Sequence, residues 1–68
     1  MNYLKDDEAM IVKAINTRRY HLELREISAG GYRVYWQCDN EEFESTIIQD
    51  LSIAMQVFDD FLVTLEGN

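Results

Sequence analysis

The sequence predicts a small α+β domain with a three-stranded antiparallel sheet and two helices packed on one sheet face, in the order α-β-β-β-α. Three observations lead to this fold class. Apolar residues recur at helical spacing near both ends of the chain, apolar and polar residues alternate through its middle, and Gly30–Gly31 separates two alternating segments. Because 68 residues provide one hydrophobic core, we expect residues 1–68 to fold as a single domain.

The first predicted element is a short helix from Asp7 to Thr17. An acidic residue at position 6 or 7 can accept hydrogen bonds from the free N–H groups of the first helical turn. Apolar residues then recur at the spacing of one helix face: Met10, Ile11, Ala14 and Ile15. We expect this face to pack on the sheet.

Two strands follow, Tyr20–Ile27 and Tyr32–Cys38, and their alternation predicts a β-hairpin. The register that gathers the apolar side chains on one face closes a three-residue loop. It places Ser28 opposite Tyr32, Leu24 opposite Trp36, and Leu22 opposite Cys38. On the other face it pairs Arg25 with Tyr35, and His21 with Asp39.

The remaining elements are an acidic turn at Asp39–Glu42, a third strand from Phe43 to Ile48, and a last helix. A helix is the competing assignment for the third strand. The last helix begins at Leu51 after a cap at Asp50 or Ser52, and it ends at Gly67. Its apolar stripe comprises Leu51, Ala54, Val57, Phe58, Phe61, Leu62 and Leu65. Since both helices need the apolar sheet face, we expect the opposite face to be open.

The charge of the chain is strongly acidic and unevenly distributed. The formal net charge is -7, and no Lys or Arg follows Arg33. The second half of the chain is therefore a polyanion, which repels nucleic acid and attracts basic protein surfaces. The alternative interpretation is that these charges serve only solubility.

The sequence offers no combination of residues that indicates catalysis, a metal site or a cofactor. His21 and Cys38 are the only residues of their kinds, and the predicted register sends them to opposite faces of the sheet. One Cys and one His are too few for a structural zinc site, and no glycine-rich phosphate loop precedes a helix. We predict that the protein is not an enzyme. The lone Cys and the lack of an export signal or apolar span favour the cytoplasm.

Two surfaces are candidates for binding a partner. The open face mixes arginine, aromatic and aliphatic groups, a composition that is enriched in protein interfaces. The acidic second half provides the other candidate. The predicted site residues are Arg33, Tyr35 and Ile48 on the open face, and the acidic Glu41, Glu42, Glu44, Asp59 and Asp60. The competing interpretation of the open face is a structural stacking of Arg25 on Tyr35.

The order α-β-β-β-α resembles the topology of double-stranded RNA-binding domains. That family places a lysine cluster at the start of its last helix, whereas this chain has Asp50-Leu51-Ser52-Ile53-Ala54 there. The charge has the wrong sign for phosphate contacts, so the resemblance implies no RNA binding. Gly30 to Val34, a following strand and Asp50 to Ala54 are also similar to HicB-type antitoxins, whose proline-rich strand motif is absent.

The leading hypothesis is a small acidic adaptor or inhibitor that docks on a basic protein surface, including one that normally holds nucleic acid. A phage or mobile-element origin is an additional hypothesis. The alternative is a homodimer or assembly subunit that buries the open face against a second copy. An isologous contact of that kind would pair patches of Tyr35 and Ile48.

Overall fold

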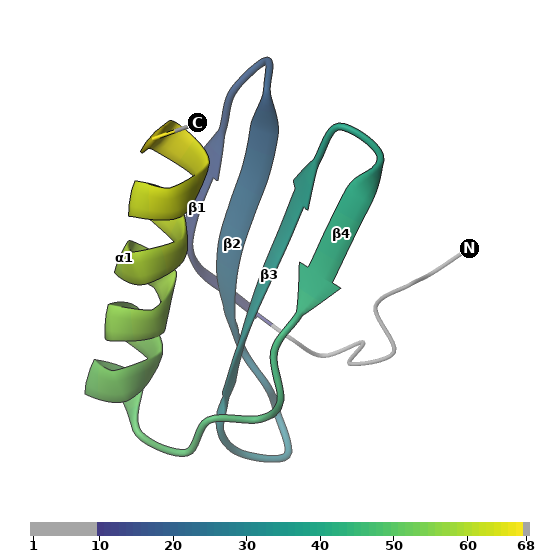
Figure 1. The fold of residues 1–68 in the computed structure, drawn as a ribbon. Helices are drawn as coiled ribbons and strands as arrows, with labels where there is room; N and C mark the ends of the chain where they lie inside the picture. Colours follow the sequence, from purple (N-terminus) through teal and green to yellow (C-terminus); the bar gives the residue numbers. More distant parts are fainter. Residues whose placement is uncertain (1–9, 68) are drawn as a thin grey trace.

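The computed structural model of the protein, which describes residues 10–67, contains a four-stranded antiparallel sheet followed by one helix (Figure 1). The strands are β1 (Met10–Asn16), β2 (Tyr20–Glu26), β3 (Tyr32–Cys38) and β4 (Glu41–Glu44), and they lie in chain order across the sheet. Helix α1 (Leu51–Gly67) lies on one face. The α+β character and the last helix are confirmed, whereas the three-stranded sheet and the order α-β-β-β-α are wrong.

The predicted first helix is wrong over Met10–Asn16, which form β1 and pair with β2. A β-bulge between Ile11 and Lys13 explains the error. The bulge inserts one residue and shifts the alternation, so the apolar residues on its two sides recur at a spacing that resembles a helix. Positions 7–9 of the predicted helix lie outside the described residues. With a strand in this place, the topology no longer matches that of double-stranded RNA-binding domains.

The β2–β3 hairpin is confirmed, but its predicted register is wrong by two residues. Leu24 pairs with Val34, and Leu22 pairs with Trp36. A shift of two residues keeps every side chain on its predicted face. The loop is longer than predicted because Glu26 pairs with Tyr32, which leaves residues 27–31 to make the connection.

Two glycines give this loop its conformation. Gly30 and Gly31 have φ of 115° and 94°, which other residues rarely adopt. The N–H of Gly30 donates to the Ile27 carbonyl at 2.8 Å, and that of Ile27 donates to the Gly31 carbonyl at 2.9 Å. Gly31 also lies against the next segment, since a Cβ there would come within 2.5 Å of Ile47 Cγ2.

The predicted acidic turn and third strand are displaced toward the N-terminus. The turn is confined to Asp39 and Asn40, with Asp39 at φ 56°, so β4 already begins at Glu41. The chain then leaves the sheet and returns at Ile48, which forms an isolated bridge with Tyr32 through two backbone hydrogen bonds of 2.8 Å. The predicted strand 43–48 is therefore the end of β4 and a separate bridge.

Helix α1 begins at the predicted cap. Asp50 Oδ1 accepts hydrogen bonds from the backbone N–H groups of Ser52 at 2.8 Å and Ile53 at 3.3 Å. A third hydrogen bond comes from the Ser52 hydroxyl. Because these hydrogen bonds favour the charged carboxylate, they lower the pKa of Asp50, the Ser52 side chain most of all.

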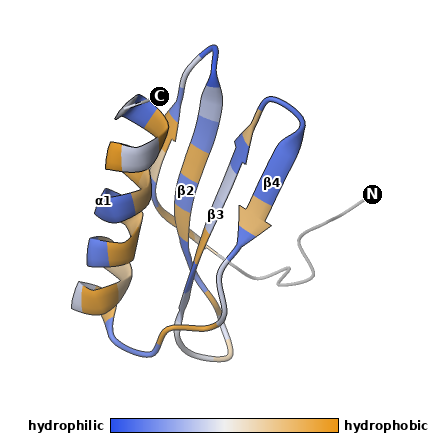
Figure 2. Cartoon of the chain, viewed as in Figure 1, coloured by the Kyte–Doolittle hydropathy of each residue, from blue (hydrophilic) through white to orange (hydrophobic). Residues whose placement is uncertain are grey.

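The core lies between α1 and the two central strands, β2 and β3. Its fully buried apolar residues are Leu22, Leu24, Val34, Ala54 and Phe58. The outer strands β1 and β4 reach the helix only through side chains. Figure 2 shows the apolar stripes of α1 and β2, and the polar residues at the start of β4. No helix within residues 10–67 has the length and apolar composition needed to cross a membrane.

Candidate functional site

Arg25 lies at the centre of the sheet face opposite α1 and is only 1% exposed. Its Nε lies 2.7 Å from Glu23 Oε2, and Nη2 lies 3.5 Å from Glu44 Oε2. Its guanidinium also stands over the ring of Tyr35, 5.4 Å from the ring centre. A buried guanidinium needs such partners to offset its lost hydration. The structure therefore contains the predicted stacking of Arg25 on Tyr35.

Four of the predicted site residues gather around Arg25. Arg33 Nη1 lies 3.4 Å from Glu44 Oε2, and the Tyr35 hydroxyl donates to Glu42 Oε1 at 3.0 Å. Glu44 thus contacts two guanidinium groups. The charges of this face, which we call the arginine face (Glu23, Arg25, Arg33, Tyr35, Glu42 and Glu44), largely compensate one another within the chain.

The structure does not bring the other predicted site residues to the arginine face. Ile48 packs against the core on the helix side of the sheet, so its predicted place on the open face is wrong. Glu41 precedes Glu42 in β4 and therefore points to the opposite face. Asp59 and Asp60 lie on α1, where Asp59 Oδ1 is 3.8 Å from Lys13 Nζ and Asp60 is exposed.

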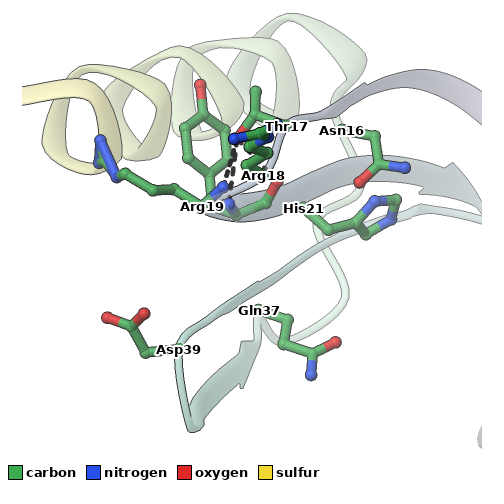
Figure 3. Close-up of a pocket in the computed structure, with 8 residues that line it drawn as sticks. Asn16, Thr17, Arg18, Arg19, His21, Gln37 and Asp39 are labelled. Carbon is green, nitrogen blue, oxygen red and sulfur yellow. Dashed lines mark hydrogen bonds between the residues drawn. The ribbon is translucent and has the colours of Figure 1, made fainter.

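A shallow polar pocket of about 270 Å³ lies where the β1–β2 turn meets the end of β3 (Figure 3). Two of its basic side chains, Arg19 and His21, already have partners in the fold. Arg19 donates to the Leu65 carbonyl near the end of α1, a common role for a cation at a helix C-terminus. His21 Nε2 lies 2.7 Å from Glu23 Oε1 and His21 pairs with Gln37, so the predicted pairing with Asp39 is wrong.

A larger groove of about 540 Å³ lies on the helix side of the sheet, between the β3–β4 hairpin and the second half of α1. We call it the aromatic groove. Its lining residues are Trp36, Cys38, Asp39, Asn40, Glu41, Phe61, Thr64 and Leu65. Of the predicted site residues only Glu41 belongs to it, so sequence reasoning missed this groove as a site.

Two aromatic rings, those of Trp36 and Phe61, line the aromatic groove, and the ring of Phe43 packs against both of them. The ring centre of Phe61 lies 6.1 Å from that of Trp36 and 5.0 Å from that of Phe43. Trp36 and Phe43 stack across β3 and β4 at 6.0 Å. Phe43 remains 40% exposed, and Trp36 and Phe61 are half-buried. The fold therefore presents a preformed aromatic surface to solvent.

The rim of the aromatic groove is acidic. Asp39 and Glu41 are both exposed, and the residues that line the groove include no Lys, Arg or His. Asp39 stands between the two hollows, because it also lines the polar pocket of Figure 3 together with Gln37. The carbonyl end of α1 adds partial negative charge near Leu65, and Arg19 is the cation that contacts it. The aromatic groove thus combines an apolar floor with carboxylates that lack a basic partner among its lining residues.

A side-chain hydrogen bond holds the C-terminal end of α1 against the start of β2. The phenol of Tyr20 donates a hydrogen bond to the carboxylate of Glu66 in the last turn of α1. That hydrogen bond, together with burial and the negative charge of Glu66, raises the pKa of Tyr20. The contact ties the start of β2 to the end of the helix that forms one wall of the groove.

Within residues 10–67, no three His, Cys, Asp or Glu side chains gather closely enough to hold a metal ion. No protein-family model matches the chain, and neither curated proteins nor solved structures include a significant match. The candidate site is therefore assigned from the geometry of this chain alone.

Proposed function

We propose that this protein is a small acidic binding domain, an adaptor or inhibitor, that docks on a basic protein surface through the aromatic groove. One observation carries the proposal: two half-buried aromatic rings and two exposed carboxylates line one concave surface. Interfaces concentrate their binding energy in aromatic anchors, while charge complementarity sets partner choice and association rate.

The distribution of compensated charge favours the aromatic groove over the arginine face. At the arginine face, Glu23 and Glu44 are held by guanidinium groups, so a basic partner would have to displace ion pairs that already exist. Asp39 and Glu41 carry no such pair in the ion pairs found among residues 10–67. A basic partner therefore gains more from the groove than from the opposite face.

The overall charge supports the same assignment. A net charge of -7 attracts basic surfaces over a distance of about 10 Å at 0.1 M salt and repels nucleic acid. A partner that uses a basic surface to hold nucleic acid would lose access to that surface while this protein occupies it. Inhibition by competition would follow from binding alone and would need no catalytic group.

The alternative, a homodimer through the face opposite α1, rested on a shared patch of Tyr35 and Ile48. These two residues lie on different faces, and the Tyr35 hydroxyl already donates to Glu42. Under our proposal the isolated protein is a monomer whose groove is open to a partner.

Neighbouring glutamates in β4 provide a matched test. E41Q removes one negative charge from the rim of the groove, and E42Q removes one from the opposite face of the same strand. We expect tagged wild-type and E42Q protein to retain the same basic protein from a lysate at low salt, and E41Q to retain less. High salt should release it. Equal retention by E41Q and E42Q would contradict the proposed docking surface.

A further inference from the structure

Helix α1 lies over the central strands β2 and β3, and different side chains occupy its two flanks. On the β1 flank, Lys13 extends from the strand to the helix. Its Nζ stands 4.7 Å from the ring centre of Phe58 and 3.8 Å from Asp59 Oδ1. The chain therefore already contains one site in which a lysine is held by an aromatic ring and a carboxylate.

The β4 flank also has aromatic rings and carboxylates, but no cation among the residues that line its groove. Phe61 follows Phe58 by one helical turn and presents its ring to the aromatic groove, beside Trp36. The carboxylates of Asp39 and Glu41 stand at the rim. In β4 the residues that face α1 are Glu41 and Phe43. In β1, by contrast, Lys13 faces the helix. No lining residue of this groove carries a positive charge.

We propose that the aromatic groove binds a lysine or arginine side chain of the protein partner. This inference rests on the proposed function and names the group that is recognised. The cation would lie over the faces of Phe61 and Trp36, with Asp39 and Glu41 as counter-charges. Its aliphatic stem would cover the apolar surface that Trp36 and Phe61 leave exposed, as long basic side chains do at protein surfaces.

The contact inside the chain and the proposed contact share their physical basis. The ring quadrupole attracts a cation at its face, and a carboxylate beside the ring adds a Coulomb interaction that salt screens. A neutral polar side chain has neither interaction. An aliphatic side chain has only the apolar contact with the floor. The groove should therefore discriminate by charge among side chains of similar length.

Trp36 provides a direct probe because it is the only tryptophan of the chain and lines the groove. Its indole N–H gives one cross-peak in a ¹H–¹⁵N spectrum. We expect titration with Nα-acetyl-lysine methylamide or Nα-acetyl-arginine methylamide to shift this peak. The norleucine and citrulline analogues, which match the two side chains without their charge, serve as controls at equal ionic strength. Binding of the cations should be tighter by about two- to fivefold, the ratio of an exposed cation–π contact.

Comparing E41Q with E42Q distinguishes binding in the groove from a general effect of the protein's negative charge. The preference for the cations should fall in E41Q and persist in E42Q. Equal shifts with lysine and norleucine analogues, or an unchanged preference in E41Q, would overturn the inference. If a basic protein were still retained by the wild type but not by E41Q, the proposed function would stand without this recognition mode. If the groove showed no preference for cations and E41Q retained a basic protein as well as E42Q did, both proposals would be overturned.

Discussion

The rings of Phe43 and Phe61 meet at 5.0 Å between their centres and at an angle of 51°, which joins the short edge strand β4 to the helix. On the helix side of the sheet, Phe43 also stacks on Trp36. Pairing with β3 and the contacts of Glu42 and Glu44 on the arginine face hold β4 as well. Phe43 is therefore the side chain that joins β4 to α1 and to the aromatic rings of the groove.

Replacing Phe43 by Ala should lower the free energy of unfolding by about 1–2 kcal/mol, because two aromatic contacts at a partly exposed site are lost. V63A is the matched control, since Val63 is 71% exposed on α1 and should change stability by less than about 0.5 kcal/mol. Urea denaturation followed by circular dichroism measures both. Equal stability of F43A and the wild type would show that the ring contacts do not hold β4.

The two loop glycines should respond differently to substitution. Both have positive φ, but a Cβ meets nothing within 4 Å at Gly30 and comes to 2.5 Å from Ile47 Cγ2 at Gly31. G31A should therefore destabilise the protein by about 1–3 kcal/mol more than G30A, the usual cost of forcing extra volume into a packed site. Thermal melts of the two variants test this directly. A larger loss in G30A would mean that backbone conformation outweighs the steric contact.

The helix cap predicts a loss of stability in acid. Hydrogen bonds from Ser52 and Ile53 hold the pKa of Asp50 below its ordinary value. A lowered pKa in the folded state means that Asp50 contributes fully above the ordinary pKa of about 4, and that its contribution is lost as the pH falls through the lowered value. D50N keeps a capping side chain but loses this titration.

The melting temperatures of wild type and D50N, measured between neutral and strongly acidic pH, give the comparison for Asp50. The difference between the two proteins should shrink as the pH falls. A difference that stayed constant across the whole range would show that the charge of Asp50 does not stabilise α1.

The hydrogen bond of Tyr20 predicts a loss of stability at alkaline pH. Its phenol donates to Glu66, and the contact raises the pKa of Tyr20. With a raised pKa in the folded state, the contribution is complete below the ordinary value of about 10 and disappears as the pH rises through the folded value. Y20F removes the donor, so the variant should be less stable at neutral pH, and its deficit should vanish at high pH. Chemical denaturation at several pH values measures both effects, and a deficit independent of pH would contradict this role.

The alternation and the helical stripe were sufficient to predict β2, β3 and α1. The period of two in Leu22, Leu24 and Val34 gives strands with one apolar face, and Asp50 gives the start of the helix. Strand β1 was missed because the bulge after Ile11 interrupts its alternation. The register was wrong by two residues because the closing pair of a glycine loop depends on backbone hydrogen bonds that residue types do not specify.

The candidate site could be predicted only in part. Charge alone pointed to Glu41, Glu42 and Glu44 together, and only the pairing of β4 with β3 shows that Glu41 faces the helix side. The pairing of Glu44 with Arg25 and Arg33 depends on the true register. The aromatic groove depends on where α1 crosses the sheet, a tertiary property that no local pattern in Phe43, Trp36 or Phe61 determines.

The central claim is that the protein docks on a basic partner through the aromatic groove and not through the arginine face. Once a partner is captured, chemical-shift mapping of the ¹⁵N-labelled protein in the complex distinguishes the two surfaces. The account predicts the largest shifts at Trp36, Glu41, Phe61 and Thr64, with Arg25 and Tyr35 nearly unchanged. Shifts centred on Arg25, Arg33 and Tyr35 would contradict it.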